Sequence, residues 1–293
     1  SDLKKMTMPL IKMRKITRQS GRQVHRSDPA YVFASLVEHR FVVAQLSRRA
    51  ILGRYRGTML GLLWSLFTPL LLLAVYTFVF GTVLQIRWVD QGGGNLEFAA
   101  ILFSGMLVHG ILAECLTQAS SLIVSNPQYV KKVVFPLEAL PWVTVISAFF
   151  QGLVSTCVLG AYLLFVNGTV PWTIIFLPLP LFSLWIACLG ITWLVAATAV
   201  FLKDIAQVAG ILSTILFFMA PILYPKTALP EQFQIFLYLN PITFIIEQFR
   251  DLALWGRLPN WGGLAAYTGV AMIFSWGSLA WFQKTRRGFA DVL

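Results

Sequence analysis

The sequence predicts an all-α integral membrane protein with six transmembrane helices, an N-terminal amphipathic interfacial helix, and re-entrant periplasmic helices between the fifth and sixth spans. Its composition is the first observation, because 57% of the 293 residues are hydrophobic and only 12% are charged, whereas soluble domains carry about 25% charged residues. The second observation is that apolar stretches of 18 or more residues recur along the chain, and each can cross the roughly 30 Å of hydrocarbon as a helix. These features exclude an ordinary soluble domain.

The basic residues predict the orientation of the spans. Of 23 Lys and Arg, 13 lie in residues 1–56, and positive charge is retained on the cytoplasmic side of membrane helices. Six spans with both termini in the cytoplasm place 19 basic residues inside and four outside: Arg87, Lys226, Arg250 and Arg257. We therefore predict a multi-pass protein of a bacterial inner membrane. The net charge of +11 lies mainly beside the first span, which favours contact with anionic membrane lipid and argues against a nucleic-acid partner.

Three regions follow one another along the chain. Residues 1–27 form a basic cytoplasmic segment, and residues 28–56 are predicted to form the amphipathic interfacial helix, since apolar residues from Tyr31 to Leu52 recur at helical spacing. An ordinary cytoplasmic helix packed on a partner subunit fits the same pattern. Residues 57–293 form the transmembrane domain, with spans expected over 58–84, 98–123, 140–166, 170–202, 205–223 and 263–282.

Proline and glycine predict where these spans are interrupted. Pro178 and Pro180 indicate a kink or break in the fourth span, and Asn167-Gly168-Thr169 indicates a tight turn before it. The region 224–261 is half apolar but too rich in proline and glycine for a continuous span. Two short helices that dip into the outer leaflet and return fit it better.

That interrupted region also carries a candidate periplasmic gate. Its residues are Tyr224, Glu247 and Arg250. Glu247 and Asp251 flank Arg250 at helical spacing, so a local ion-pair network is the alternative to a gate.

The motifs that are missing exclude several kinds of chemistry. The chain has no G-x-x-x-x-G-K-[ST] phosphate-binding loop and no H-E-x-x-H motif. Its three cysteines lie in apolar stretches without metal-ligand spacing. We therefore expect no catalytic residue, no metal and no cofactor on this chain, and energy for transport must come from another chain or from an ion gradient.

Glu114 is the most notable charged group inside a predicted span. It lies near His109 and shares a helix face with Gln118. An ionisable residue in a membrane helix is a functional candidate, so an ion-coupled carrier or a membrane glycosyltransferase that uses this carboxyl group remains an alternative. A hydrogen-bonded structural role inside the bundle is the simpler interpretation.

Aromatic residues of the first span are candidates for the lining of a conduit. Trp64, Phe67 and Tyr76 lie deep in that span, and aromatic rings can stack on the C–H faces of sugars, so that a repetitive polymer slides past them. Contact with lipid or with the protein core is the alternative.

Seven segments, in this order, resemble the ABC-2-type polysaccharide export permeases. The first runs from Arg54 through Trp64 to Pro69. The others are Asn126–Glu138, Phe201–Ile205, Pro221–Pro225, Asn240-Pro241, Glu247 with Arg250, and Phe289–Leu293. In the third segment Lys203 stands where the family usually has Arg, which keeps the positive charge but not the forked donor that a bidentate pairing requires.

The resemblance implies a half-transporter. Two copies would form a homodimeric channel, and each would dock a separate P-loop ATPase subunit that holds the ATP and Mg²⁺. Such permeases export lipid-linked O-antigen, capsule or teichoic-acid chains. The first-span segment looks more like the O-antigen type, so we favour O-antigen export, with a capsule or teichoic-acid exporter as the alternative.

Two groups of residues are candidates for coupling and gating in such a transporter. Residues 125–135 form the only substantial internal loop, so the predicted ATPase-coupling helix contains Asn126, Pro127, Gln128, Tyr129, Lys131 and Lys132. A basic gate for a pyrophosphate-linked lipid head group is predicted from Arg48, Arg49, Arg54 and Arg56. Anchoring to lipid phosphates is the alternative for these arginines.

Overall fold

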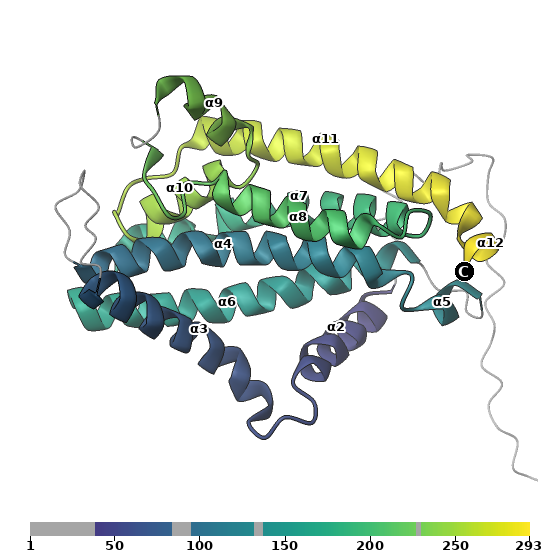
Figure 1. Cartoon of the computed structure of the whole chain (residues 1–293), viewed down its shortest axis with the longest axis horizontal. Coiled ribbons are helices and arrows are strands. Elements are labelled where there is room, and N and C mark those ends of the chain that lie inside the picture. Colours follow the sequence, from purple (N-terminus) through teal and green to yellow (C-terminus); the bar gives the residue numbers. More distant parts are fainter. Residues whose placement is uncertain (1–38, 84–94, 132–136, 227–229) are drawn as a thin grey trace, which may run out of the picture.

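The computed structural model of the chain describes residues 39–83, 95–131, 137–226 and 230–293. In these ranges every regular element is a helix (Figure 1). Residues 1–27 and the first part of the predicted interfacial helix lie outside the described residues. The all-helical prediction is confirmed.

Five helical segments of the described ranges are long and apolar enough to cross a membrane. They are Gly61–Phe80, Phe98–Leu122, Leu137–Asn167, Trp172–Ala199 and Trp261–Gly288. The main helices within them are α3 (Trp64–Tyr76), α4 (Asn95–Leu122), α6 (Leu140–Asn167), α7 (Pro178–Ala199) and α11 (Trp261–Thr285). Helices α4, α6, α7 and α11 lie side by side along the long axis (Figure 1), and α7 packs against both α4 and α11.

The segment predicted as the fifth span forms a shorter helix than expected. Helix α8 covers Ile205–Phe218, which is 14 residues or about 21 Å at 1.5 Å per residue. Its carbonyl groups near the end are bound by side chains rather than by a further turn of helix: Asn240 Nδ2 donates to the Leu216 carbonyl at 2.8 Å, and the Tyr224 hydroxyl donates to that of Phe218 at 2.6 Å. The path beyond Phe218 is therefore non-helical but hydrogen-bonded.

The predicted interruptions appear where proline and glycine place them. A short 3₁₀ helix, η4 (Trp172–Phe176), precedes α7, which begins at Pro178, so the predicted break is confirmed. Gly168 caps the end of α6 with a φ of 70°, a left-handed conformation that glycine adopts without strain. This confirms the predicted turn.

Two short helices occupy the region between α8 and α11, as predicted. They are α9 (Glu231–Leu239) and α10 (Thr243–Ala253). Helix α10 packs against α4, α7 and η4, and most of its residues are buried. Both helices lie at one end of the bundle (Figure 1), and their insertion into the outer leaflet stays a prediction.

The opposite end of the bundle carries α5 (Pro127–Lys131) and the chain terminus (Figure 1). Here η3 (Leu137–Ala139) leads into α6, and η6 (Arg286–Gly288) with α12 (Phe289–Val292) follows α11. Because α4, α7 and α11 all run toward this end, the coupling-helix candidate and the C-terminus lie on one side of the bundle.

Helix α2 (Arg40–Arg54) and α3 form a V beside the bundle (Figure 1). Helix α2 packs against α6. The connection turns sharply at Gly57 and Gly61, whose φ values are 85° and 52°, conformations that disfavour any side chain. This elbow lies close to the predicted gate arginines.

Candidate gate and coupling site

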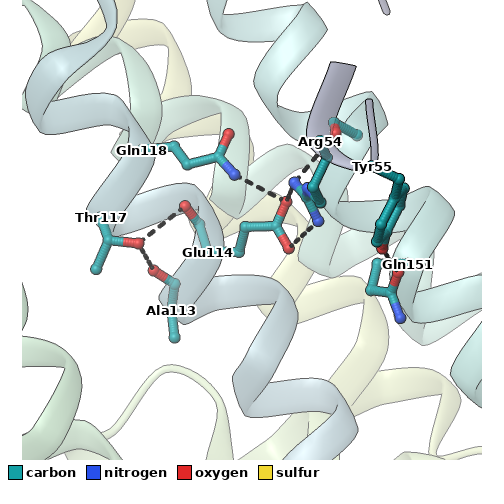
Figure 2. Close-up of polar contacts among 8 residues, drawn as sticks. Arg54, Tyr55, Ala113, Glu114, Thr117, Gln118 and Gln151 are labelled. Carbon is teal, nitrogen blue, oxygen red and sulfur yellow. Dashed lines mark hydrogen bonds and ion pairs between the residues drawn. The ribbon is translucent and has the colours of Figure 1, made fainter. Parts of the chain in front are cut away.

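An ion pair between Arg54 and Glu114 joins the end of α2 to the middle of the bundle. Arg54 Nη1 donates to Glu114 Oε2 at 3.2 Å, and Nη2 donates to Oε1, so the guanidinium binds the carboxylate with both nitrogens (Figure 2). Gln118 Nε2 donates to the same carboxylate at 3.1 Å, and Arg54 Nη2 also reaches Ser147 Oγ at 3.3 Å. The side chains of Arg54 and Glu114 are 30% and 19% exposed. Glu114 is therefore a carboxylate held by three neighbouring side-chain donors rather than an isolated acid.

A second link ties the elbow after α2 to α6. The Tyr55 hydroxyl donates to Gln151 Oε1 at 2.9 Å (Figure 2), and Gln151 Nε2 donates to the Ser65 carbonyl at 3.0 Å. The residues on both sides of the Gly57 turn are thus attached to α6. This arrangement holds α2 and the start of α3 against the bundle while the glycine turn between them has open space around it.

The structure divides the four predicted gate arginines into two groups. Arg48, Arg49 and Arg56 line one hollow of about 760 Å³ beside the elbow. Arg54 does not line it and is engaged with Glu114 instead. Gln45 and Tyr55 also line this hollow. Three guanidinium groups in one hollow can bind a multiply charged phosphate group.

The predicted coupling residues form a short helix at the end of α4. Asn126 precedes α5 and its side-chain amide donates to the Leu122 carbonyl at 2.9 Å, so the two helices are joined directly. Pro127, Gln128, Tyr129 and Lys131 belong to α5, and Lys132 lies outside the described residues.

One cavity lies between the coupling-helix candidate α5 and the arginine-bearing helix α2. Its volume is about 380 Å³, and its walls come from α2, α4, α6 and the α5 region. Asn126, Gln128 and Tyr129 line it together with Arg49 and Ser147. Ser147 also contacts Arg54, so the coupling helix, the arginine hollow and the Arg54–Glu114 pair form one continuous region.

Arg250 has a different environment from the one that the sequence predicted. It was counted among the outer charges, but the structure buries it completely between α10, α4 and the segment after α8. Its Nη1 donates to the Pro221 carbonyl at 2.6 Å, and its Nη2 and Nε donate to the Ile101 carbonyl at 2.9 and 3.2 Å. Burial lowers the pKa of Arg250 to about 9, so the guanidinium keeps its charge at neutral pH. Gly105 leaves the space for it, since a Cβ there would lie 2.8 Å from Nη2.

The other predicted gate residues surround the same segment. Glu247 pairs with Lys226 at 3.1 Å, and Tyr224 binds the end of α8 as described above. Asp251 pairs with Arg257 at 3.6 Å. The two acids flanking Arg250 thus have other basic partners, while the hydrogen bonds of Arg250 described above go to main-chain carbonyls. The structure brings Tyr224, Glu247 and Arg250 together, and their gating role stays a prediction.

Phe67 and Tyr76, two of the three candidate conduit aromatics, do not share one face of α3. Tyr76 is partly buried against the core, on the same side as Ser65, Pro69 and Leu73. Phe67 is 41% exposed, and its nine-residue separation from Tyr76 places it on the opposite side of a helix with 3.6 residues per turn. A conduit lined by Phe67 would therefore need a second surface beside α3, whereas Tyr76 contacts Phe80 within the chain.

Residues 42–254, well over half of the chain, match the model of the ABC-2 type transporter family. The chain therefore belongs to the ABC-2 type transporter family. This ABC-2 chain is 28% identical over 263 residues to the O-antigen export system permease protein RfbA of Myxococcus xanthus, covering 87% of this chain and 96% of the relative. It is 28% identical over 247 residues to the permease of the same name from Klebsiella pneumoniae, covering 82% and 90%.

Several contacts of this ABC-2 transporter chain were not predicted from the sequence. The partner of Glu114 is one, and the Tyr55–Gln151 link is another. A lone acid in a membrane helix signals that a partner exists, but the sequence offers no way to choose Arg54 among the basic residues before the first span. No group of three metal-binding side chains was found among the described residues.

Proposed function

We propose that this chain is the membrane-spanning permease subunit of an ATP-driven exporter of lipid-linked polysaccharide, with O-antigen as the favoured cargo. Two copies form a channel in the inner membrane, and each is driven by a separate P-loop ATPase subunit. The cytoplasmic location of both termini belongs to this proposal. ATP and Mg²⁺ are bound by the ATPase subunits, and this chain carries out transport without catalysing a reaction.

The observation that carries the proposal is the likeness to O-antigen export permeases over nearly their whole length. The match to the Myxococcus protein covers 96% of that relative, so the likeness is not confined to one helix or motif. The family match covers α2 through α10. Cargo and partners are inferred from this likeness together with the site.

The geometry at the α5 end supports ATPase coupling. Helix α5 lies at the end of the bundle (Figure 1), and Gln128 is exposed on it. Because the Asn126 side chain joins the start of α5 to the end of α4, a push on α5 reaches α4. Helix α4 is largely buried, so such a push is transmitted to the centre of the chain.

The arginine hollow supports recognition of a phosphorylated lipid head group. Arg48, Arg49 and Arg56 line it, and it lies beside the elbow between α2 and α3. A diphosphate carries enough negative charge to interact with three guanidinium groups. Anchoring of α2 to membrane phospholipid would use the same chemistry, and the two sources are separated by asking whether the arginines affect export or only membrane binding.

Exposed apolar helices support assembly of two copies. Helices α3 and α8 each pack against α4 and carry rows of exposed side chains, including Phe67, Val75, Ile211 and Phe218. A second copy could cover part of these surfaces, and lipid the rest. A channel between two copies would place Phe67 toward the polymer path, as the conduit hypothesis requires.

The rival functions that use Glu114 gain no support from the site. Arg54 and Gln118 already bind its carboxylate, so it is held as a structural anion rather than presented to a proton path or a sugar substrate. A capsule or teichoic-acid exporter remains the alternative within the family, because the same architecture serves either cargo.

Co-purification tests the proposal. The chain is expressed with the ATPase encoded beside it, extracted in mild detergent and assayed for an equimolar complex that hydrolyses ATP. Gln128→Trp places a bulky group on α5 and is expected to lower ATPase binding at least tenfold. The matched control is Gln232→Trp, an exposed glutamine on α9 at the other end of the bundle, which should bind normally.

Two results would contradict the proposal. One is a permease that purifies alone even when ATPase is supplied, and the other is equal binding by both tryptophan variants. Deletion of the gene followed by analysis of surface polysaccharide identifies the cargo, since loss of O-antigen, capsule or teichoic acid are separable outcomes.

A further inference from the structure

Helix α5 is too short to be stable by itself. It has five residues, whereas isolated helices shorter than about 12–15 residues are marginal in water. Tertiary contacts must therefore hold it in place. Asn126 holds its start against the end of α4, and α12, at the end of the chain, packs against α5.

The residues after α11 fold back into the protein. Phe289 is fully buried, with its ring 5.6 Å from that of Phe282 at the end of α11 and 6.0 Å from that of Phe201 after α7. The end of the chain is thus packed between two long helices and α5. A segment packed on three elements can pass displacement from one to another.

An ion pair between the partly exposed Arg286 and the buried Glu138 strengthens this junction. Arg286 Nη1 lies 2.6 Å from Glu138 Oε2, and Glu138 is only 3% exposed. The main-chain carbonyl of Glu138 also accepts a hydrogen bond from Trp193 Nε1 of α7, at 3.2 Å. Glu138 therefore joins the start of α6 to α7 and to the end of α11. Neither residue takes part in the gate region described above.

We propose that Arg286 is a positioning residue that couples α5 to helices α7 and α11. Its bond to Glu138 attaches the end of α11 to η3, which also binds Trp193 of α7, and the packing of α12 on α5 attaches the same end of α11 to α5. Displacement of α5 by an ATPase is thereby passed to α11 and α7, which pack extensively against each other. This inference rests on the proposed function, because it requires an ATPase that acts on α5.

The test compares three variants of the complete complex with its ATPase. Arg286→Gln removes the charge, Arg286→Lys keeps it, and Arg287→Gln makes the same change at an exposed neighbour. The measurements are the amount of assembled complex, its rate of ATP hydrolysis, and the surface polysaccharide exported per complex. For Arg286→Gln we expect near-normal assembly and hydrolysis with at least a tenfold loss of export per ATP hydrolysed. Arg286→Lys should fall between this variant and wild type, and Arg287→Gln should match wild type.

Two results would overturn the inference. One is normal export per ATP in Arg286→Gln. The other is a loss of export that only follows the loss of assembled complex, both in Arg286→Gln and in Glu138→Gln, since that would show a purely structural role. Failure of the proposed function has a different signature, because the wild-type chain would then bind no ATPase or export no polymer.

Discussion

Replacing Glu114 by Gln tests whether the Arg54–Glu114 pair holds α2 on the bundle. The substitution keeps the shape of the side chain but removes its charge, and its new amide group would face a nitrogen of Arg54. Exposed ion pairs contribute about 0–1 kcal/mol, and loss of one partner from a buried pair costs about 3–5 kcal/mol. Since the two side chains are 30% and 19% exposed, we expect Glu114→Gln to lower the free energy of unfolding by about 1–2 kcal/mol.

The assay is a double-mutant cycle with Arg54→Gln. Unfolding of the detergent-purified chain is followed by tryptophan fluorescence during titration with SDS, and the interaction energy of the pair is obtained from the four proteins. The matched control is Glu247→Gln, the same chemical change in a pair whose Lys226 partner is 52% exposed, and it should cost less than about 1 kcal/mol. An interaction energy below about 0.3 kcal/mol, which is within the usual error of additivity, would refute the reasoning that this pair fixes α2.

Three further predictions concern packing, the buried arginine and the hollow. Gly190→Ala in α7 should destabilise the chain by about 1–3 kcal/mol, because its Cβ would lie 2.9 Å from the main chain of α11, whereas Gly160→Ala, with open space around it, should be neutral or slightly stabilising in the same titration. Arg250→Lys should lower the free energy of unfolding by about 2–4 kcal/mol, since an ammonium group cannot reach the Pro221 and Ile101 carbonyls at once as the planar guanidinium does. Unchanged stability would contradict the role of these hydrogen bonds in holding α10 on the bundle. Arg49→Gln should reduce export several-fold while Arg40→Gln, on the same helix but outside the hollow, should not, as measured by surface polysaccharide at equal protein levels.

Much of the fold follows from local properties of the sequence. The break before α7, predicted from Pro178 and Pro180, and the turn at Gly168 depend on single local residue types, and both were predicted correctly. The position at which α8 ends was not predicted correctly, because no local pattern reveals that the side chains of Asn240 and Tyr224 bind the last carbonyl groups of the helix. Side chains from elsewhere thus allow the helix to stop before a full membrane crossing.

In the candidate site too, some features were predicted from the sequence and others were decided by packing. The arginines near the first span were recognised as a group by their charge, but the structure separates Arg54 from the three that line the hollow. Arg250 was predicted to belong to a periplasmic gate, with a local ion-pair network as the alternative, and the structure binds its guanidinium to main-chain carbonyls. Charge identifies such residues, and packing decides their partners.

The sequence by itself determined that this protein is a helical membrane protein, because a backbone in hydrocarbon must satisfy its own hydrogen bonds and long apolar segments do so as helices. It also determined where proline and glycine interrupt those helices. Only the tertiary structure decided that Arg54 binds Glu114, 60 residues away, and that Arg250 binds the carbonyl of Ile101, 149 residues away. Such contacts depend on which helix faces lie together, and that is set by the packing of the whole bundle rather than by any local pattern.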